Sequence, residues 1–469
     1  MFLPVPGTSS LMREYNVSIK TRQQTQSMTS GAPLRLLIAF ALPLMLGNVF
    51  QQCYLIADTL IVSRRLGVDA LAALGTTDWH LYLISSVIQA LVQGFSILLA
   101  QQFGAQDRNN LRKTYAQSVL LCVLFAGVMT AGAELSIPLV MHLLNVPLSI
   151  RPMSALYILI YFAGIPAQVL YHFTASVLRA FGNSRTPFTA MVFSSILNIL
   201  LDILFVLILP WGIAGAAAAT VLSQVCSALW CLIPVSRLEL LSGLSRRLFR
   251  PDWDLDRRLL LLAAPMILQN ALISVGGMIV TAVANLFGVD FIAGYAAAGK
   301  LYGAIETAAI AYGFACTTYT GQNLGAGRMD RVREGFRKAM LLAVLTSGVI
   351  TLFTILFGRS ITAVFLTGDA ARVAAAGEIA YHYLFILSVN LPILYSLYVA
   401  RSTLHGLGDT VIPMISGLAE FVVRIYMAVW VSRRLGAEAL FYGEIAAWVA
   451  ADIVLMAAVV RRLKRPGGS

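Results

Sequence analysis

Long apolar segments separated by short polar ones extend along most of this 469-residue chain. A helix needs about 20 mostly apolar residues to cross a bilayer. Stretches of this kind lie near residues 36–62, 70–102, 114–138, 153–178, 187–209, 212–235, 258–286, 291–323, 339–358, 374–400, 411–431 and 439–460. The pattern predicts an all-α polytopic membrane protein with twelve transmembrane helices.

Several short motifs occur twice, once in each half of the chain. The pairs are Gly67-Val68-Asp69 with Gly288-Val289-Asp290, Gln101-x-x-Gly104-Ala105 with Gln322-x-x-Gly325-Ala326, Leu178-x-x-x-Gly182-x-x-x-x-Pro187 with Leu404-x-x-x-Gly408-x-x-x-x-Pro413, and Pro43 and Asn48 with Pro265 and Asn270. Such a duplication in a membrane protein predicts two six-helix repeats with the substrate path between them.

Polar segments divide the chain into five parts. We expect residues 1–33 to form a cytoplasmic N-terminal tail, 34–236 a first lobe with helices 1–6, 237–257 a cytoplasmic linker, 258–460 a second lobe with helices 7–12, and 461–469 a basic cytoplasmic tail. The N-terminal segment lacks the apolar core and small-residue cleavage site of a signal peptide. Met28 is an alternative start, since the transmembrane pattern begins soon after it.

Composition supports the membrane assignment. Mean hydropathy is +0.79, and charged residues make up 12% of the chain, against about 25% in soluble domains. The net charge of +12 is concentrated in the linker, near residues 328–338 and at the C-terminal end. Under the positive-inside rule this places both termini in the cytoplasm and the protein in the cell membrane. Because the charge follows the topology, it argues against a nucleic-acid partner.

Ionisable and amide side chains inside the first six apolar segments are the candidate chemistry, since hydrocarbon makes each one costly. Asp58 lies near the end of the first segment, and Asn198 and Asp202 are four residues apart in the fifth, on one helical face. At the rise of an α-helix, Asp202 lies about 22 Å from the cytoplasmic end of its helix. Thr220 lies about 12 Å from the outer end of the sixth.

These depths predict that Asp58, Asn198, Asp202 and Thr220 meet at one level inside the first six helices. Two neighbouring carboxylates in a low dielectric favour holding a proton, which gives a proton-accepting site. The same oxygen ligands also suit Na+, so the residues leave the choice between H+ and Na+ open. The alternative is that each acid is a helix-end residue near the outer interface.

Charged and aromatic side chains also occur in the second half. Glu420 and Arg424 are four residues apart and are expected to pair. Lys300 and Glu306 either face a central cavity or pair within the lobe. Tyr302 either stacks on a flat cationic ligand or serves as a packing residue.

The sequence contains no motif for nucleotide hydrolysis or other catalysis. Gly294-x-x-x-x-Gly299-Lys300 matches most of a phosphate-binding loop, but Leu301 replaces the required Ser or Thr and the segment is apolar. Metal-protease and serine-nucleophile motifs are absent. We therefore expect neither an enzyme nor a cofactor, and transport driven by an ion gradient.

Motifs along the chain after residue 33 resemble those of the multidrug and toxic compound extrusion (MATE) transporters, with the DinF-type branch as the best match. The similar segments are Asp58-Thr59, Gly67-Val68-Asp69-Ala70-Leu71-Ala72-Ala73, Gln101-x-x-Gly104-Ala105, Asn198-Ile-Leu-Leu-Asp202, Gly215-Ala216-Ala217-Ala218-Ala219-Thr220 and Gly321-Gln322-Asn323-Leu324-Gly325-Ala326-Gly327. They occur in the family's order and on the corresponding helices.

The resemblance implies two six-helix lobes in a V-shaped arrangement that exchange drugs or metabolites for H+ or Na+. Asp58 matches the family's helix-1 aspartate, and Pro43, fifteen residues earlier, matches the proline at which that helix bends. Asn198, Asp202 and Thr220 match the ion network of the first lobe. The repeat makes Val280 the counterpart of Asp58, and residues 258–286 contain no acid. Ion coupling is therefore expected in the first lobe.

We expect a monomeric antiporter that exports organic compounds, cationic or amphipathic in character, across the lipid bilayer in exchange for H+ or Na+. The alternative is a flippase for lipid-linked precursors, which shares the two-lobe design. A flippase should have a strongly basic cavity for pyrophosphate, whereas only Lys300 and Arg424 are embedded cations here. An intramembrane enzyme or a channel is a further alternative that no motif supports.

Overall fold

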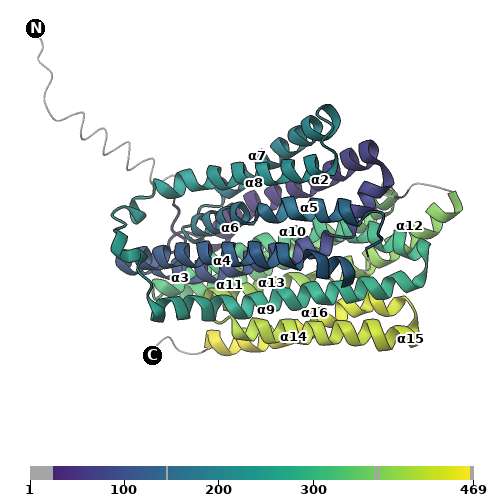
Figure 1. Cartoon of the computed structure of the whole chain (residues 1–469). Coiled ribbons are helices and arrows are strands. Elements are labelled where there is room, and N and C mark those ends of the chain that lie inside the picture. The colour runs from purple at the N-terminus through teal and green to yellow at the C-terminus, as the bar shows by residue number, and fades with distance from the viewer. Residues whose placement is uncertain (1–24, 144–145, 364–365, 367–369, 465–469) are drawn as a thin grey trace, which may run out of the picture.

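The computed structural model describes residues 25–143, 146–363, 366 and 370–464. Of the expected tails at 1–33 and 461–469, residues 1–24 and 465–469 lie outside the described residues. Within the described part the chain is helical, and its long helices run side by side as one elongated bundle (Figure 1). The all-α prediction is confirmed.

The first repeat comprises the helices before the linker. They are α2 (Pro33–Gly75), α3 (Asp78–Gly104), α4 (Arg108–Leu143), α5 (Arg151–Ala163), α6 (Ile165–Ala180), α7 (Arg185–Asp202), a π-helical segment (Ile203–Ile208) and α8 (Gly212–Ser236). Two short 3-10 turns, Glu239–Leu241 and Arg246–Phe249, lie in the linker.

The second repeat follows the same plan. Its elements are α9 (Trp253–Ala284), a 3-10 turn (Asn285–Phe287), α10 (Val289–Gly325), α11 (Met329–Ala363), α12 (Ala370–Val389), α13 (Leu391–Gly406), α14 (Val411–Tyr426), a π-helical segment (Met427–Val431), α15 (Ser432–Leu435) and α16 (Glu438–Lys464). The limits of the predicted lobes and linker remain predictions.

Among the described residues, nine helices are long and apolar enough to cross a membrane, and two bent helix pairs raise this number to eleven. The remaining long helix is α10, which packs against α2, α3, α11, α12 and α13. Because protein rather than lipid surrounds much of α10, its sequence tolerates more small and polar residues. Together these segments give the predicted twelve-helix architecture.

Two spans are bent where the sequence suggested continuous helices. The α5–α6 pair bends by 45° and the α12–α13 pair by 51°. Proline is the second residue of α6 (Pro166) and of α13 (Pro392). A proline removes a backbone donor and disfavours helical geometry at the preceding residue, which ends the preceding helix. The equivalent bends are a structural sign of the duplication.

Turn geometry repeats as well. Gly182 follows α6 with φ of 81°, and Gly408 follows α13 with φ of 82°, in the left-handed region that suits glycine. Each turn leads into a helix, α7 or α14, that ends in a π-helical segment. The two halves of the chain therefore fold alike, as the repeated motifs predicted.

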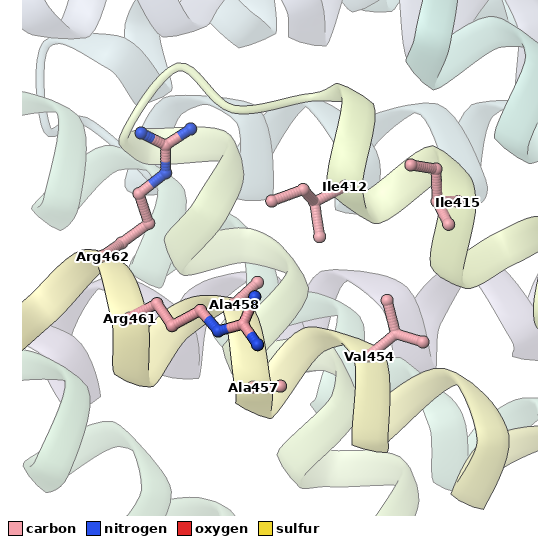
Figure 2. Close-up of a pocket in the computed structure, with 7 residues that line it drawn as sticks. All are labelled: Ile412, Ile415, Val454, Ala457, Ala458, Arg461 and Arg462. Carbon is pink, nitrogen blue, oxygen red and sulfur yellow. The ribbon is translucent and has the colours of Figure 1, made fainter.

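A surface hollow of about 450 Å3 lies between α14 and α16 (Figure 2). Ile412 and Ile415 line one side of it, and Val454 and Arg461 come from α16. Arg462 turns toward Asp409 and pairs with it at 2.6 Å. All residues that line this hollow belong to the second repeat.

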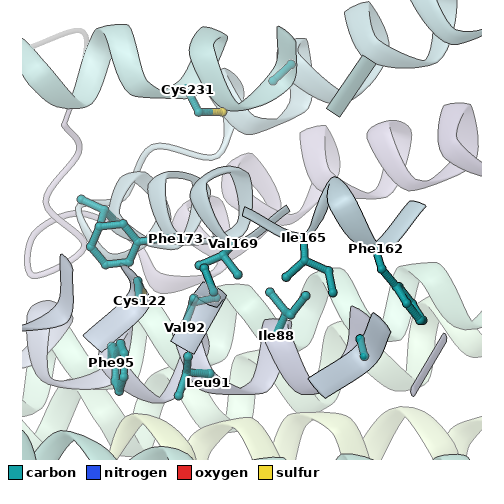
Figure 3. Close-up of a cluster of buried hydrophobic side chains, with 14 of the residues drawn as sticks. Ile88, Leu91, Val92, Phe95, Cys122, Phe162, Ile165, Val169, Phe173 and Cys231 are labelled. Atoms are coloured by element: carbon teal, nitrogen blue, oxygen red, sulfur yellow. The ribbon is translucent and has the colours of Figure 1, made fainter. Parts of the chain in front are cut away.

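Close packing between helices forms the core of each repeat. Figure 3 shows Ile88 and Leu91 of α3 beneath Ile165 and Val169 of α6. The first helix of each repeat also reaches the other repeat's core, with Leu259 and Ala263 of α9 in the first core and Leu36–Leu44 of α2 in the second. The two repeats are thus held together along α2 and α9.

Candidate functional site

Two buried carboxyl groups meet inside the first repeat. Helix α2 carries Asp58 to the C-terminal end of α7, where Asp202 is the last residue. The residues are 8% and 0% exposed, and their side chains lie within hydrogen-bonding contact. A hydrogen bond between two carboxyl groups needs one of them to be protonated, because an ionised carboxylate only accepts. The arrangement therefore suits a shared proton.

Asn198 and Thr220 complete this group, which we call the acid site (Asp58, Asn198, Asp202 and Thr220). With its amide oriented to satisfy its neighbours, Asn198 donates to Asp202 Oδ2 at 3.2 Å and accepts from the Thr220 backbone N–H at 3.3 Å. The Thr220 hydroxyl donates to the Ala216 carbonyl at 3.1 Å. The structure thus brings all four predicted residues together.

Unsatisfied oxygen atoms remain at the centre of the site. Oδ1 of Asp58 and Oδ1 of Asp202 are buried and have no hydrogen-bond partner within the described chain. A buried acceptor without a partner costs about 1–3 kcal/mol. A proton or a small cation at these oxygens would remove that cost, so the site is chemically suited to either ion.

Local helix geometry positions the acids. Asn198 and Asp202 occupy one face of α7, and directly after Asp202 the helix widens into its π-helical segment. Such segments occur often at functional sites because they turn side chains out of the regular helical register. Glycine at position 215 lets α8 approach this segment closely, since a Cβ there would lie 3.0 Å from Cβ of Phe205.

A small polar cavity of about 80 Å3 lies in the same repeat. Its lining residues are Gln51, Tyr54, Gln168, Tyr171, His172, Met191, Ser194, Ser195, Gln224 and Ser227. At about 30 Å3 per water molecule it has room for two or three waters, and it is far below the roughly 300 Å3 of a drug-sized site. It is therefore too small to be a pocket for a drug-sized substrate.

Sequence reasoning missed this cavity, although the chain carries a signal for it. Tyr54 precedes Asp58 by one helical turn, Ser194 precedes Asn198, and Gln224 follows Thr220, each at a spacing of four. Polar side chains repeated at that spacing line one face of an otherwise apolar helix. Three such faces meeting on α2, α7 and α8 form the polar interior of the repeat.

The predicted cavity residues of α10 lie in the second repeat. Tyr302 stacks on Trp448 with ring centroids 6.0 Å apart, and Glu306 accepts a hydrogen bond from the Tyr398 hydroxyl at 2.8 Å. Lys300 is exposed near the start of α10, and electrostatic contact links it with Asp78 of α3. The three residues therefore do not form one cluster with the acid site.

The other embedded charges of the second repeat form a network. The predicted pair of Glu420 and Arg424 is present at 2.9 Å. Arg401 also binds Glu420 at 3.0 Å, and Arg424 binds Glu444 at 2.8 Å. Arg401 and Glu444 come from α13 and α16, so the spacing within one helix gave no indication of them.

No group of three or more His, Cys, Asp or Glu side chains that could hold a metal ion occurs in the described ranges. The acid site contains two carboxylates, one amide and one hydroxyl, which suits a proton or a weakly bound monovalent cation rather than a transition metal.

A duplicated bundle of membrane-spanning helices with a buried pair of acids in one repeat defines a polytopic membrane transporter. The MatE family model matches the chain twice, over residues 43–204 and 265–430. The chain therefore belongs to the MatE family of multidrug and toxic compound extrusion transporters.

Individual relatives agree with this membership. The chain is 31% identical over 399 residues to the Bacillus subtilis protein named "Probable multidrug resistance protein YpnP", covering 85% of this chain and 88% of that protein. It is 27% identical to DNA damage-inducible protein F of Escherichia coli, over 66% of this chain and 68% of that one.

A solved structure shows the same fold. The outward-facing structure of a multidrug resistance MATE family transporter of the MOP superfamily superposes with a TM-score of 0.85 at 22% sequence identity. The superposition covers 94% of this chain and 98% of that one. The likeness confirms the V-shaped, two-repeat fold expected from the sequence.

Proposed function

We propose that this chain is a secondary antiporter that exports organic compounds, cationic or amphipathic in character, in exchange for H+ or Na+. The acid site carries the proposal, because it holds two buried carboxyl groups whose charge a single entering ion can change. Membership in a family of multidrug efflux transporters supports the export of small molecules. Neither a cofactor nor a partner subunit enters the proposed mechanism.

The basic end of the bundle is proposed to face the cytoplasm. The linker, the turns before α7 and α14, and the end of α16 lie at this end, where Gln117 binds the carbonyls of Leu248 and Arg250 and Arg333 binds that of Leu463. The linker and the end of α16 are rich in arginine, as the positive-inside rule expects of cytoplasmic segments of a protein in the cell membrane.

Coupling follows from the charge of the acid site. When an ion or proton is bound, Asp58 and Asp202 can stay in contact and α2 packs on α7. When both are ionised, repulsion in a low dielectric favours their separation. Pro43 lies within α2, fifteen residues before Asp58, and its missing N–H makes that position the natural point for α2 to bend.

Such a change drives export only if the two arrangements differ in affinity for the ion and for the exported compound. The acid site supplies the difference for the ion, because its two carboxyl groups are adjacent in one arrangement and apart in the other. We propose that bending of α2 reshapes the surface that the first repeat presents to substrate. We propose that the aromatic and charged side chains of α10, including Lys300, Tyr302 and Glu306, then act on substrate from the opposite repeat.

The flippase alternative is not favoured by the charges of the second repeat. A pyrophosphate headgroup needs cationic side chains that are available for it. Arg401 and Arg424 are instead buried and neutralised by Glu420 and Glu444.

Purified protein in liposomes loaded with a fluorescent organic cation such as ethidium tests the proposal. We expect efflux to follow an imposed pH gradient or an imposed Na+ gradient, and we expect the Asp58→Asn variant to lose that response. Gradient-driven efflux that is unchanged in this variant would contradict coupling at the acid site. Movement of a labelled lipid without any response to an ion gradient would favour the flippase instead.

A further inference from the structure

The charged network of the second repeat occupies the position that the acid site and its cavity occupy in the first. Arg424 lies 226 positions after Asn198, the same separation as between Gly182 and Gly408, which share their turn geometry. The two helices concerned, α7 and α14, both end in a π-helical segment. Arg424 is therefore the counterpart of Asn198.

Both acids of the first repeat are lost at their counterparts. Asp202 corresponds to Ala428 at the same separation, and Asp58 corresponds to Val280 at the separation of 222 that relates Pro43 to Pro265. Val280 and Ala428 are 3% and 1% exposed and belong to the apolar core of the second repeat. The second repeat thus has no acid pair at these positions.

In the second repeat, carboxylates occupy positions other than the counterparts of Asp58 and Asp202. Glu420 is the counterpart of Ser194, a residue that lines the small cavity of the first repeat. Gly276 is the counterpart of Tyr54, which lines the same cavity. A Cβ on Gly276 would lie 3.7 Å from Nη1 and Cδ of Arg424. The Arg424 guanidinium is therefore next to the space that corresponds to the Tyr54 side chain in the first repeat.

Formal charges within the network cancel. Arg424 donates to Glu420 Oε1 at 2.9 Å and to Glu444 Oε2 at 2.8 Å, while Arg401 donates to Glu420 Oε2 at 3.0 Å. Two guanidinium groups and two carboxylates therefore neutralise one another in a buried setting. Removing one partner from such a group leaves an uncompensated buried charge, which strongly destabilises the fold.

We propose that Arg424 is a tethered cation, and that Glu420 and Glu444 form a cation site in the second repeat that this guanidinium permanently fills. The first repeat takes its cation from solution, whereas the second carries one on its own chain. This interpretation of the asymmetry rests on the proposed ion coupling in the first repeat, but the binding site itself can be tested without transport.

The proposal predicts the effect of removing the Arg424 side chain. In the Arg424→Ala variant, Glu420 and Glu444 are left with an opening that Gly276 does not fill, and a free guanidinium ion should enter it. We expect low-millimolar guanidinium chloride to raise the Tm of the purified variant by about 2 °C relative to the same concentration of choline chloride. The unaltered protein should show no such rise, because its site is full.

Matched variants separate a cation site from a general effect of salt. Arg424→Lys retains a tethered cation and should stay insensitive to guanidinium. Arg424→Ala combined with Glu444→Gln removes one of the two carboxylates and should lose the response. Arg359→Ala, which removes a guanidinium from the exposed pair with Glu378, should also show none.

An R424A protein that folds and shows no stabilisation by guanidinium would overturn the proposal, as would equal stabilisation of R424K. If R424A does not accumulate, the R424A/E444Q variant tests the proposal instead, because its remaining Arg401 and Glu420 still neutralise each other. A monodisperse R424A/E444Q protein supports the neutralising role of Arg424. Its failure overturns that role, because shape rather than charge would then be the contribution of the arginine. Loss of Asp58-dependent transport bears on the proposed antiport alone and leaves this binding test intact.

Discussion

Gln101 and Gln322 are counterparts in the two repeats, and each donates the same hydrogen bond across to the other repeat. Gln101 Nε2 binds the Gly406 carbonyl at the end of α13 at 3.0 Å. Gln322 Nε2 binds the Ala180 carbonyl at the end of α6 at 2.8 Å. Each bond satisfies a carbonyl at a helix end that has no partner within its own helix.

Close backbone contact accompanies this pair of bonds. A Cβ on Gly104 would lie 1.9 Å from the Gln322 carbonyl oxygen, and one on Gly325 would lie 1.8 Å from that of Gln101. The end of the bundle that carries the basic residues is thus closed by two symmetrical contacts. Opening this end requires both hydrogen bonds to break.

Gly325→Ala should therefore drive the repeats apart at this end, because the added methyl group cannot share space with a backbone carbonyl. We expect spin labels at the exposed positions Asn109 and Asp330 to show a longer distance in the variant. Gly348→Ala is the control, since a Cβ there meets no atom within 4 Å. An unchanged distance distribution in Gly325→Ala would contradict the proposed closure.

Residues 26–31 bridge the two repeats at the same end. The Met28 N–H donates to Gln322 Oε1 at 2.7 Å, Arg331 Nη2 donates to the Gly31 carbonyl at 2.9 Å, and the Gln26 N–H donates to the Phe181 carbonyl at 3.0 Å. Arg331→Met should release this segment, because it removes the buried donor to Gly31.

The measurement is hydrogen–deuterium exchange of residues 26–31, which we expect to become faster in Arg331→Met. Arg333→Met is the matched control, as Arg333 binds the Leu463 carbonyl instead. Equal exchange of the segment in both variants would mean that Arg331 does not hold it.

Asn198 is predicted to set ion affinity at the acid site. Asn198→Leu removes the donor to Asp202 and leaves that buried oxygen without a partner, at a cost of about 1–3 kcal/mol. A change of about 1.4 kcal/mol in binding free energy corresponds to a tenfold change in affinity. The apparent affinity for the coupling ion should therefore change by about tenfold or more.

Ion-concentration dependence of efflux measures this change, with Ser223→Ala as control. Ser223 has a buried hydroxyl on α8 that donates to the Ala219 carbonyl rather than to either acid. An Asn198→Leu variant with the same ion dependence as Ser223→Ala would refute the role of the amide.

Asp252 should stabilise the start of α9 in a pH-dependent way. It caps the helix by accepting from the Leu255 N–H at 3.1 Å and pairs with Lys113 of α4. The Lys113 ammonium and this backbone donor lower the pKa of Asp252 below its usual value. A lowered pKa in the folded state gives stability above the unfolded pKa of about 3.9, and this stability is lost as the pH falls through the folded value.

We therefore expect Asp252→Ala to lower the Tm at neutral pH, and we expect this effect to shrink as the pH falls below the unfolded pKa. Asp254→Ala, in the exposed first turn of the same helix, is the control. A difference in Tm that stays constant as the pH falls through the acidic range would show that the charge of Asp252 is not what stabilises the helix.

The sequence allowed the helices and the first-repeat residues to be predicted because both depend on local properties. Apolar length gives a span, and spacing with depth places Asn198, Asp202 and Thr220 at one level. The pair of Glu420 and Arg424 was also accessible, since its spacing of four lies within one helix.

Features that depend on packing between helices could not be predicted from spacing along the sequence. Arg401 and Glu444 come from separate helices whose rotation about their own axes is fixed only by tertiary contacts. The repeated motif around Gln101 and Gln322 was visible, but its bonding partners on the opposite repeat were not. Pro166 and Pro392 indicate the bends at the start of α6 and α13. A prediction based only on the length of the apolar segments does not use these prolines.

Coupling by the acid site is tested most directly by replacing both acids, Asp58→Asn with Asp202→Asn, in protein reconstituted with a fluorescent organic cation. Asparagine preserves size and hydrogen bonding while removing the charge that an ion can neutralise. We expect the double variant still to bind the organic cation but to show no efflux in response to a pH or Na+ gradient that drives the unaltered protein. Full gradient-driven efflux by the double variant would contradict the central claim that these two carboxyl groups couple transport to the ion.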